Sequence, residues 1–138
     1  MKFKGKIGVL YYFILLGVSI VFIVSLFNTT NIGVLEYYAK ISILGLAEIL
    51  VVSLTLRNYI AVDNVKMTIY LGLFKKIIYC NDIIQLKETN DSTSSMAMSL
   101  DRIEIATTYG RVMVSVKDKK AFIEKLCEYN NQIEYLAN

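Results

Sequence analysis

The sequence predicts a two-helix transmembrane hairpin followed by a small, mainly β (α+β) barrel that one C-terminal helix closes. Three observations predict this fold class: two long apolar runs near the N-terminus, alternating short runs after them, and an amphipathic segment near the C-terminus. The 138 residues suffice for about one domain, and a hydrophobic fraction of 55% is high for a wholly soluble one. We therefore expect a membrane anchor over residues 1–57 and a cytosolic domain over residues 58–138.

The first apolar run, residues 7–27, contains no charged side chain. As an α-helix it would be ~30 Å long, which is the thickness of a bilayer core. Lys2, Lys4 and Lys6 give it the basic start of a signal peptide, but it exceeds a signal-peptide core of roughly 7 to 15 residues and no small-x-small cleavage pattern follows. We expect a retained transmembrane helix.

The second apolar run covers about residues 38–56 and follows the polar link 28–33. Two spans joined by a short link form a hairpin whose ends lie on one side of the membrane. Three lysines precede the first span and Arg57 follows the second, whereas the link side has Glu36 and Lys40. The positive-inside rule therefore predicts a multi-pass protein of the plasma membrane with both termini in the cytoplasm.

Glu48 lies near the middle of the second span, at about the depth of Gly17 in an antiparallel partner helix. A carboxyl group there is costly unless it is protonated or paired. It is either a proton or ligand handle of a small transporter or sensor subunit, or a protonated hydrogen-bonding contact beside Gly17 or Ser19. We favour the contact, because two helices offer little room for a transport path.

After Arg57 the apolar residues alternate in short runs that turn residues separate. A longer polar loop, residues 90–95, carries no lysine or arginine cluster, so a solvated hairpin loop is favoured over an anion site. Lys75 and Lys76, with Arg57, would touch anionic lipids if that edge faced the membrane, although charges at strand ends are usually only solvated. The expected strands are residues 59–62, 65–71, 74–79, 83–88, 99–107 and 111–116.

A helix is expected after Ser115, which begins the pattern S-V-K-D. Ser115 would cap this helix and Asp118, three residues on, would cap Ser115 in return. Phe122, Ile123 and Leu126 then fall on one face. Short antiparallel strands followed by one helix suit a split barrel of the pleckstrin-homology (PH) type, and an OB-like barrel or an open sheet with one helix remains possible.

The composition excludes several classes of function. The chain has no histidine, so it cannot form a Ser-His-Asp or Cys-His nucleophile system or a His-ligated metal site. Cys80 and Cys127 form no C-x-x-C motif and are expected to be reduced. Residues 57–138 carry 11 Lys+Arg against 10 Asp+Glu, which gives no support to nucleic-acid binding. We predict no catalytic, cofactor or metal site and no small-molecule substrate.

The stretch SSMAMSLDRIEI, residues 94–105, gathers the most reactive side chains of the chain. A nucleophilic Ser99 would need a base, and no S-x-x-K or G-x-S-x-G context surrounds it. The apolar alternation changes phase between Leu100 and Ile103. A bulge or bend at Asp101 and Arg102 would return the apolar side chains on both sides of this change, up to Leu100 and from Ile103 on, to the core. We therefore interpret this stretch as a structural signature.

Several segments together resemble the YyaB-like bacterial PH-domain proteins, the group that includes the sublancin immunity protein. They are YIAVDNVKMTIYLGL, KKIIYCNDI, SLDRIEI and VSVKDKKAFIEKL, after two N-terminal spans. Ser115-Val116 stands where members commonly have Ser-Pro, and residues 95–98 replace a run of small residues and proline. The resemblance implies a bacterial membrane protein with a PH-like domain and offers no catalytic residues to carry over.

These observations lead us to expect a non-enzymatic membrane protein whose cytosolic domain docks a protein partner or another copy of itself near the lipid bilayer. The alternative, which the resemblance implies, is self-immunity against a sublancin-like bacteriocin. A second alternative is the transporter or sensor subunit built on Glu48.

Overall fold

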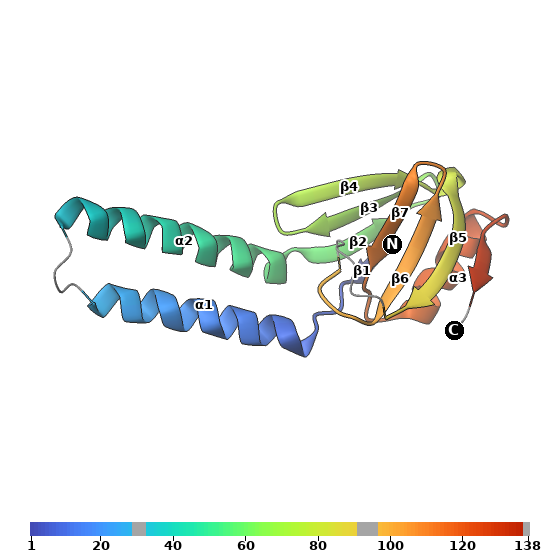
Figure 1. The fold of residues 1–138 in the computed structure, drawn as a ribbon. Helices are drawn as coiled ribbons and strands as arrows, with labels where there is room; N and C mark the ends of the chain where they lie inside the picture. Colours follow the sequence, from blue (N-terminus) through green and yellow to red (C-terminus); the bar gives the residue numbers. More distant parts are fainter. Residues whose placement is uncertain (29–32, 91–96, 137–138) are drawn as a thin grey trace.

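The computed structural model describes residues 1–28, 33–90 and 97–136 and shows a helical hairpin joined to a β domain (Figure 1). Helices α1 (Val9–Phe27) and α2 (Val34–Leu56) form the hairpin. Both are long and apolar enough to cross a membrane. In the most apolar stretch of each helix, only 6% of the residues in α1 and 0% of those in α2 are buried. Their apolar side chains therefore face outward, as lipid-facing side chains do.

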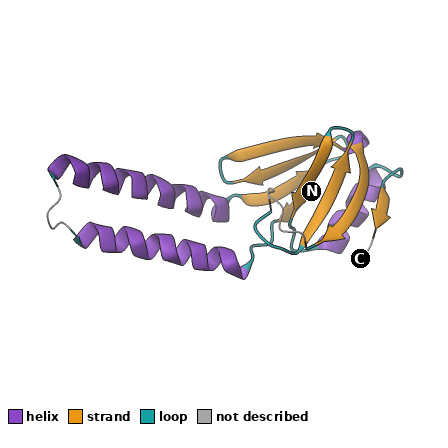
Figure 2. Ribbon diagram, in the orientation of Figure 1, coloured by secondary structure: helices purple, strands orange, loops and turns teal. Residues whose placement is uncertain are grey.

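The β domain consists of two four-stranded sheets (Figure 2). The first has the order β1-β2-β3-β4 and is antiparallel throughout. The second has the order β7-β6-β5-β8, in which β8 is parallel to β5. The strands are β1 (Lys2–Lys4), β2 (Asn58–Val62), β3 (Lys66–Leu71), β4 (Phe74–Tyr79), β5 (Ile83–Thr89), β6 (Arg102–Thr107), β7 (Gly110–Val114) and β8 (Glu134–Leu136).

The core lies between the two sheets and helix α3 (Lys119–Tyr129). Phe122 of α3 is fully buried and meets Phe3 of β1 edge to face, with 5.2 Å between the ring centroids. Ile123 and Leu126 are buried beside it, as the helical periodicity predicted. The predicted fold class, two apolar helices followed by a mainly β PH-like domain with a C-terminal helix, is confirmed.

The first five residues belong to the β domain rather than to the anchor in which the sequence placed them. Lys2–Lys4 pair with residues 59–61 of β2, and Gly5 bridges Val116 beyond β7. These residues form a strand because they alternate: Phe3 faces the core, while Lys2 and Lys4 face outward. The strand at the N-terminus thus links the two sheets.

Two backbone contacts fix the hairpin to the domain. At the start of α1, the Gly8 N–H donates to the Met98 carbonyl oxygen at 2.8 Å. At the end of α2, the Gly72 N–H in the β3–β4 turn donates to the Arg57 carbonyl oxygen at 2.8 Å. Gly72 has φ +56°, and a Cβ there would lie 2.8 Å from Leu54. Glycine is required for both the turn and its approach to α2.

One expected strand begins later than predicted, and one further strand, β8, was not expected. Strand β6 begins at Arg102 rather than at residue 99, because residues 98–101 bend. Strand β8 was not predicted, since its three exposed residues carry no alternation. The polar loop expected at residues 90–95 falls, apart from Asn90, outside the described residues.

Candidate functional site

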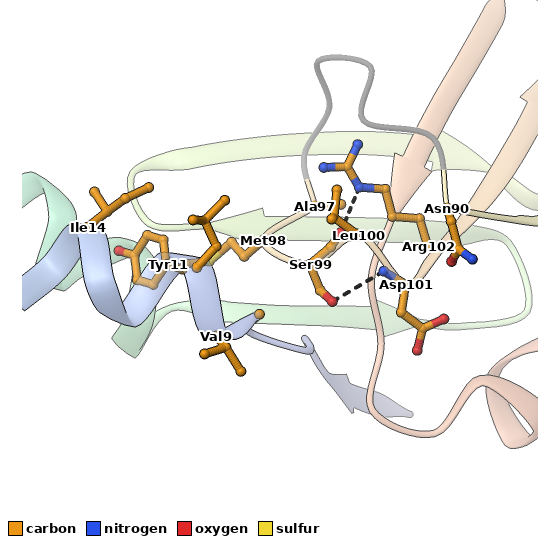
Figure 3. A pocket seen from close by; sticks show the side chains of 12 residues that line it. Val9, Tyr11, Ile14, Asn90, Ala97, Met98, Ser99, Leu100, Asp101 and Arg102 are labelled. Carbon is orange, nitrogen blue, oxygen red and sulfur yellow. Dashed lines mark hydrogen bonds between the residues drawn. The ribbon is translucent and has the colours of Figure 1, made fainter.

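The junction between α1 and the second sheet forms an open groove of about 590 Å³ (Figure 3). One wall is the start of α1, including Tyr11 and Ile14, and the other is residues 97–102 with Asn90. Its lining is mostly apolar and includes the half-exposed Leu100. The groove therefore lies where the apolar hairpin ends and the polar domain begins.

The signature residues Ser99, Leu100, Asp101 and Arg102 line this groove. The Ser99 hydroxyl accepts the Asp101 backbone N–H at 3.3 Å, and the Ser99 carbonyl accepts Arg102 Nε at 2.6 Å. These short-range bonds hold the predicted bend before β6. The bend buries Ile103, but Leu100 remains 53% exposed, so the expectation that both apolar sets return to the core is wrong for Leu100.

Asp101 is the centre of an ion-pair network that the sequence did not indicate. Lys6 Nζ lies 2.5 Å from its Oδ2, and Lys119 contacts its Oδ1. Lys119 also lies 3.1 Å from Glu88, which accepts the Tyr135 hydroxyl at 2.6 Å. The network joins the chain before α1 to β5, α3 and β8.

The network shifts the proton affinities of its members. Hydrogen bonds from Lys119 and then Lys6 lower the pKa of Asp101. Hydrogen bonds from Tyr135 and then Lys119 lower the pKa of Glu88. Burial lowers the pKa of Lys119, but its bonds to Asp101 and Glu88 outweigh burial, so that the pKa is raised. All these shifts favour the charged forms, which is typical of structural ion pairs.

Ser115 does not cap α3, contrary to the sequence prediction. Its hydroxyl donates to the Asp101 carbonyl at 3.0 Å and to the Lys6 carbonyl at 3.4 Å. The cap is Asp118, whose Oδ1 accepts the Ala121 N–H at 3.2 Å. The helix begins three residues later than a Ser115 cap requires, because β-type pairing continues through Val116.

Glu48 contacts the first span through Ser19. The Ser19 hydroxyl donates to Glu48 Oε1 at 2.6 Å. The second carboxyl oxygen, Oε2, is buried without a partner among the described residues. Gly17 is not part of this contact, since a Cβ there would meet nothing within 4 Å. The structure thus brings Glu48 and Ser19 together and leaves Gly17 apart.

The cysteines and acidic groups do not converge on a common centre. Cys80 is buried and Cys127 half-buried, and burial raises the pKa of both thiols. Within residues 1–28, 33–90 and 97–136, no group of at least three His, Cys, Asp or Glu side chains could hold a metal ion.

The fold and the junction define a class: a small two-sheet β domain attached directly to an apolar helical hairpin. Residues 58–130 match the family described as bacterial PH domain, so the chain belongs to the bacterial PH domain family. The match confirms the resemblance at the level of that family. No curated protein and no solved structure matches the chain significantly. With its two candidate spans, the chain fits a membrane protein with a PH-like domain.

Proposed function

We propose that the protein is a non-enzymatic integral membrane protein whose PH domain docks a protein partner at the cytoplasmic face of the membrane. The observation that carries the proposal is the apolar groove at the junction. Contacts at Gly8 and Gly72 hold the domain against both helix ends, so the groove stays at the level of the membrane surface. A tethered domain binds neighbouring membrane proteins at high effective concentration, so weak contacts suffice.

The occupant that best fits this groove is an apolar segment of another membrane protein. One wall is the first half of α1, which faces lipid, and the other carries the exposed Leu100. A segment that follows α1 and emerges from the bilayer would contact both walls. The ion pairs of Asp101 lie behind the groove and hold its domain wall to the chain before α1.

A photo-crosslinking residue at Leu100 tests this docking in native membranes. We expect it to capture a discrete membrane-protein partner, and the same residue at Ile84 of β5 to capture none. The two positions are matched in exposure, 53% and 52%. Equal capture at both positions, or none at Leu100, would contradict docking at the groove.

The proposed topology places both termini in the cytoplasm. The pairing of β1 with β2 supports a common side for both ends of the hairpin, because these strands flank it and can meet only on one side of a membrane. The lysines before α1 and Arg57 after α2 favour the cytoplasm as that side. In intact cells, a membrane-impermeant thiol reagent should label Gly33→Cys in the link but not Tyr109→Cys, which is 87% exposed in the domain. The unsubstituted chain and lysed cells are the controls, and the reverse labelling would invert the topology.

Self-immunity against a bacteriocin is the second candidate, because the chain resembles the YyaB-like subgroup. The two most family-like segments, SLDRIEI and VSVKDKKAFIEKL, meet where Ser115 and Lys119 bind Asp101. Expression in a sensitive strain should then protect it from sublancin-like peptides. Unchanged sensitivity at a normal protein level would count against immunity.

A transporter or sensor subunit is the third candidate, and it is favoured by Glu48 Oε2, which has no hydrogen-bond partner among the described residues. Glu48→Gln keeps the side-chain shape and removes the titratable proton. We expect this variant to keep docking and protein level, since we assign Glu48 to helix contact. Loss of function at a normal protein level would instead assign Glu48 a functional role.

A further inference from the structure

The turn between β3 and β4 lies beside the C-terminal end of α2. Its Gly72 bonds to Arg57, the first residue after α2, and approaches Leu54 and Ser53 in the last helical turn. Figure 1 shows this hairpin extending back along the end of α2. The following residues, Leu73 and Phe74, are therefore held beside the end of α2, which under the proposed membrane embedding is the boundary of the bilayer.

The tip of this turn is apolar and exposed. Leu73 is 73% and Phe74 59% exposed, although a β-hairpin tip in water is ordinarily polar. Lys75 and Lys76 follow directly and are exposed, and Arg57 lies beside the turn. An apolar tip flanked by cations is the arrangement by which surface elements enter the headgroup region of anionic membranes.

A row of four side chains crosses the outer face of the first sheet next to this tip. The strand register pairs Lys4 with Tyr59, Tyr59 with Tyr70, and Tyr70 with Lys75. The two tyrosine rings stack at 4.7 Å, with Arg57 5.0 Å from the Tyr70 ring centroid. Tyrosine is enriched at membrane interfaces because its ring is apolar and its hydroxyl polar.

The charge of the first sheet has one sign. Strands β1–β4 contain five lysines and, in this described part of the chain, no aspartate or glutamate. Asp63 lies in the β2–β3 turn, at the opposite end of the strands from the α2 junction, where it accepts the backbone N–H groups of Val65 and Lys66. The lysines of these four strands therefore have no acidic side chain on their own strands that would compete with an external anion.

We propose that Leu73 and Phe74 insert into the headgroup region of the bilayer and that the row Lys4, Tyr59, Tyr70, Lys75, together with Arg57, binds anionic phospholipid headgroups. This inference rests on the proposed membrane embedding with the domain in the cytoplasm. It assigns the first sheet to lipid and leaves the groove on the second sheet open to the protein partner.

The chain contains no tryptophan, so a single introduced tryptophan reports its own depth. The full-length protein is reconstituted in vesicles of phosphatidylcholine with or without phosphatidylserine, in which either lipid carries bromine as a quencher. We expect brominated lipid to quench Phe74→Trp, and to quench it more strongly when the bromine is on phosphatidylserine. Tyr109→Trp, in the β6–β7 turn away from the α1–α2 hairpin, should remain unquenched.

Leu16→Trp, in the middle of α1, separates the two proposals. Quenching of Leu16→Trp without quenching of Phe74→Trp overturns the inference and leaves the embedding intact. Loss of quenching at both positions overturns the embedding and the inference with it. Equal quenching of Phe74→Trp by neutral and anionic lipid overturns the anionic headgroup site.

Charge removal then tests the cations. In the Phe74→Trp background, Lys75→Gln should lower the preference for phosphatidylserine about fivefold, the factor expected for one surface cation. Lys120→Gln on α3 makes the same change in net charge away from the tip and should leave the preference unchanged. Equal effects of the two substitutions would overturn the assignment to this row.

Discussion

The two sheets of the domain use charge in different ways. Strands β1–β4 carry five lysines and no acid, whereas β5–β8 carry three basic and three acidic residues. In the second sheet Glu88 pairs with Lys119 and Glu104 with Arg111. At the first sheet, Lys2 of β1, Lys75 of β4 and Arg57, which precedes β2, lie over tyrosine rings rather than against carboxylates. Charge thus holds the second sheet together, while in the first it remains available to an external anion.

The largest expected loss of stability is in the core that the two sheets share with α3. Phe122→Ala removes the fully buried ring that packs against Phe3, so both sheets lose contacts to α3. We expect a loss of about 3–5 kcal/mol in the free energy of unfolding. Denaturant unfolding of the domain in detergent-solubilised protein measures it, with Tyr109→Ala as the exposed control. A loss below 1 kcal/mol would show that α3 is not part of the common core.

The second effect is at the contact between the first sheet and α2. Gly72→Ala places a Cβ at φ +56° and within 2.8 Å of Leu54. We expect a loss of about 1–2 kcal/mol from the left-handed backbone, and a larger loss if α2 cannot yield. Gly33→Ala is the matched control, because a Cβ there meets nothing within 4 Å. Equal stability of the two variants would contradict the tight contact.

The third effect is at the ion pairs of the second sheet. Asp101→Asn should cost about 1 kcal/mol or less at neutral pH, since the pair is partly exposed. The lowered pKa of Asp101 means that its contribution is present above the unfolded pKa of about 4 and is lost as the pH falls through the folded pKa. The variant and the unsubstituted chain should therefore converge in stability in acid.

Unfolding measured from pH 7 down to pH 2 checks this dependence. Glu124→Gln, an exposed change on α3, should show no such convergence. A constant difference between Asp101→Asn and the unsubstituted chain at every pH would mean that charge is not what Asp101 contributes.

The smallest effect is expected for the first sheet. Lys75→Gln should change the free energy of unfolding by less than about 0.5 kcal/mol, because the exposed Lys75 side chain lies over the Tyr70 ring and not against a buried group. Lys119→Gln, which breaks bonds to Asp101 and Glu88, should cost more. The same unfolding experiment compares them. A larger loss of unfolding free energy from Lys75→Gln than from Lys119→Gln would contradict the different use of charge in the two sheets.

Local periodicity was sufficient for much of the fold. The alternation predicted β3 and β4 to within one residue, and the helical pattern of Phe122 and Leu126 predicted the buried face of α3. Strand β1 was missed because its lysines also satisfy the positive-inside pattern of a membrane span. The same short sequence is compatible with a β-strand and with the basic flank of a membrane span. Only its pairing with β2 shows that it is a strand.

The candidate site was less predictable because its contacts are distant in sequence. Asp101 and Lys6 are 95 residues apart, so no local pattern links them. Ser115 was assigned to a cap because S-x-x-D is a common helix start, but tertiary bonds to Asp101 and Lys6 compete for its hydroxyl. Glu48 and Ser19 were predictable, because depth in an antiparallel hairpin follows from counting residues.

The pairing of β1 with β2 has a consequence for biogenesis. β1 is synthesised before helices α1 and α2, whereas its partner β2 is synthesised only after them. Phe3 cannot reach Phe122 until α3 has emerged. Under the proposed topology, completion of the sheet therefore depends on insertion of both helices, and a chain with one helix misplaced is left with an unpaired strand edge and an exposed core.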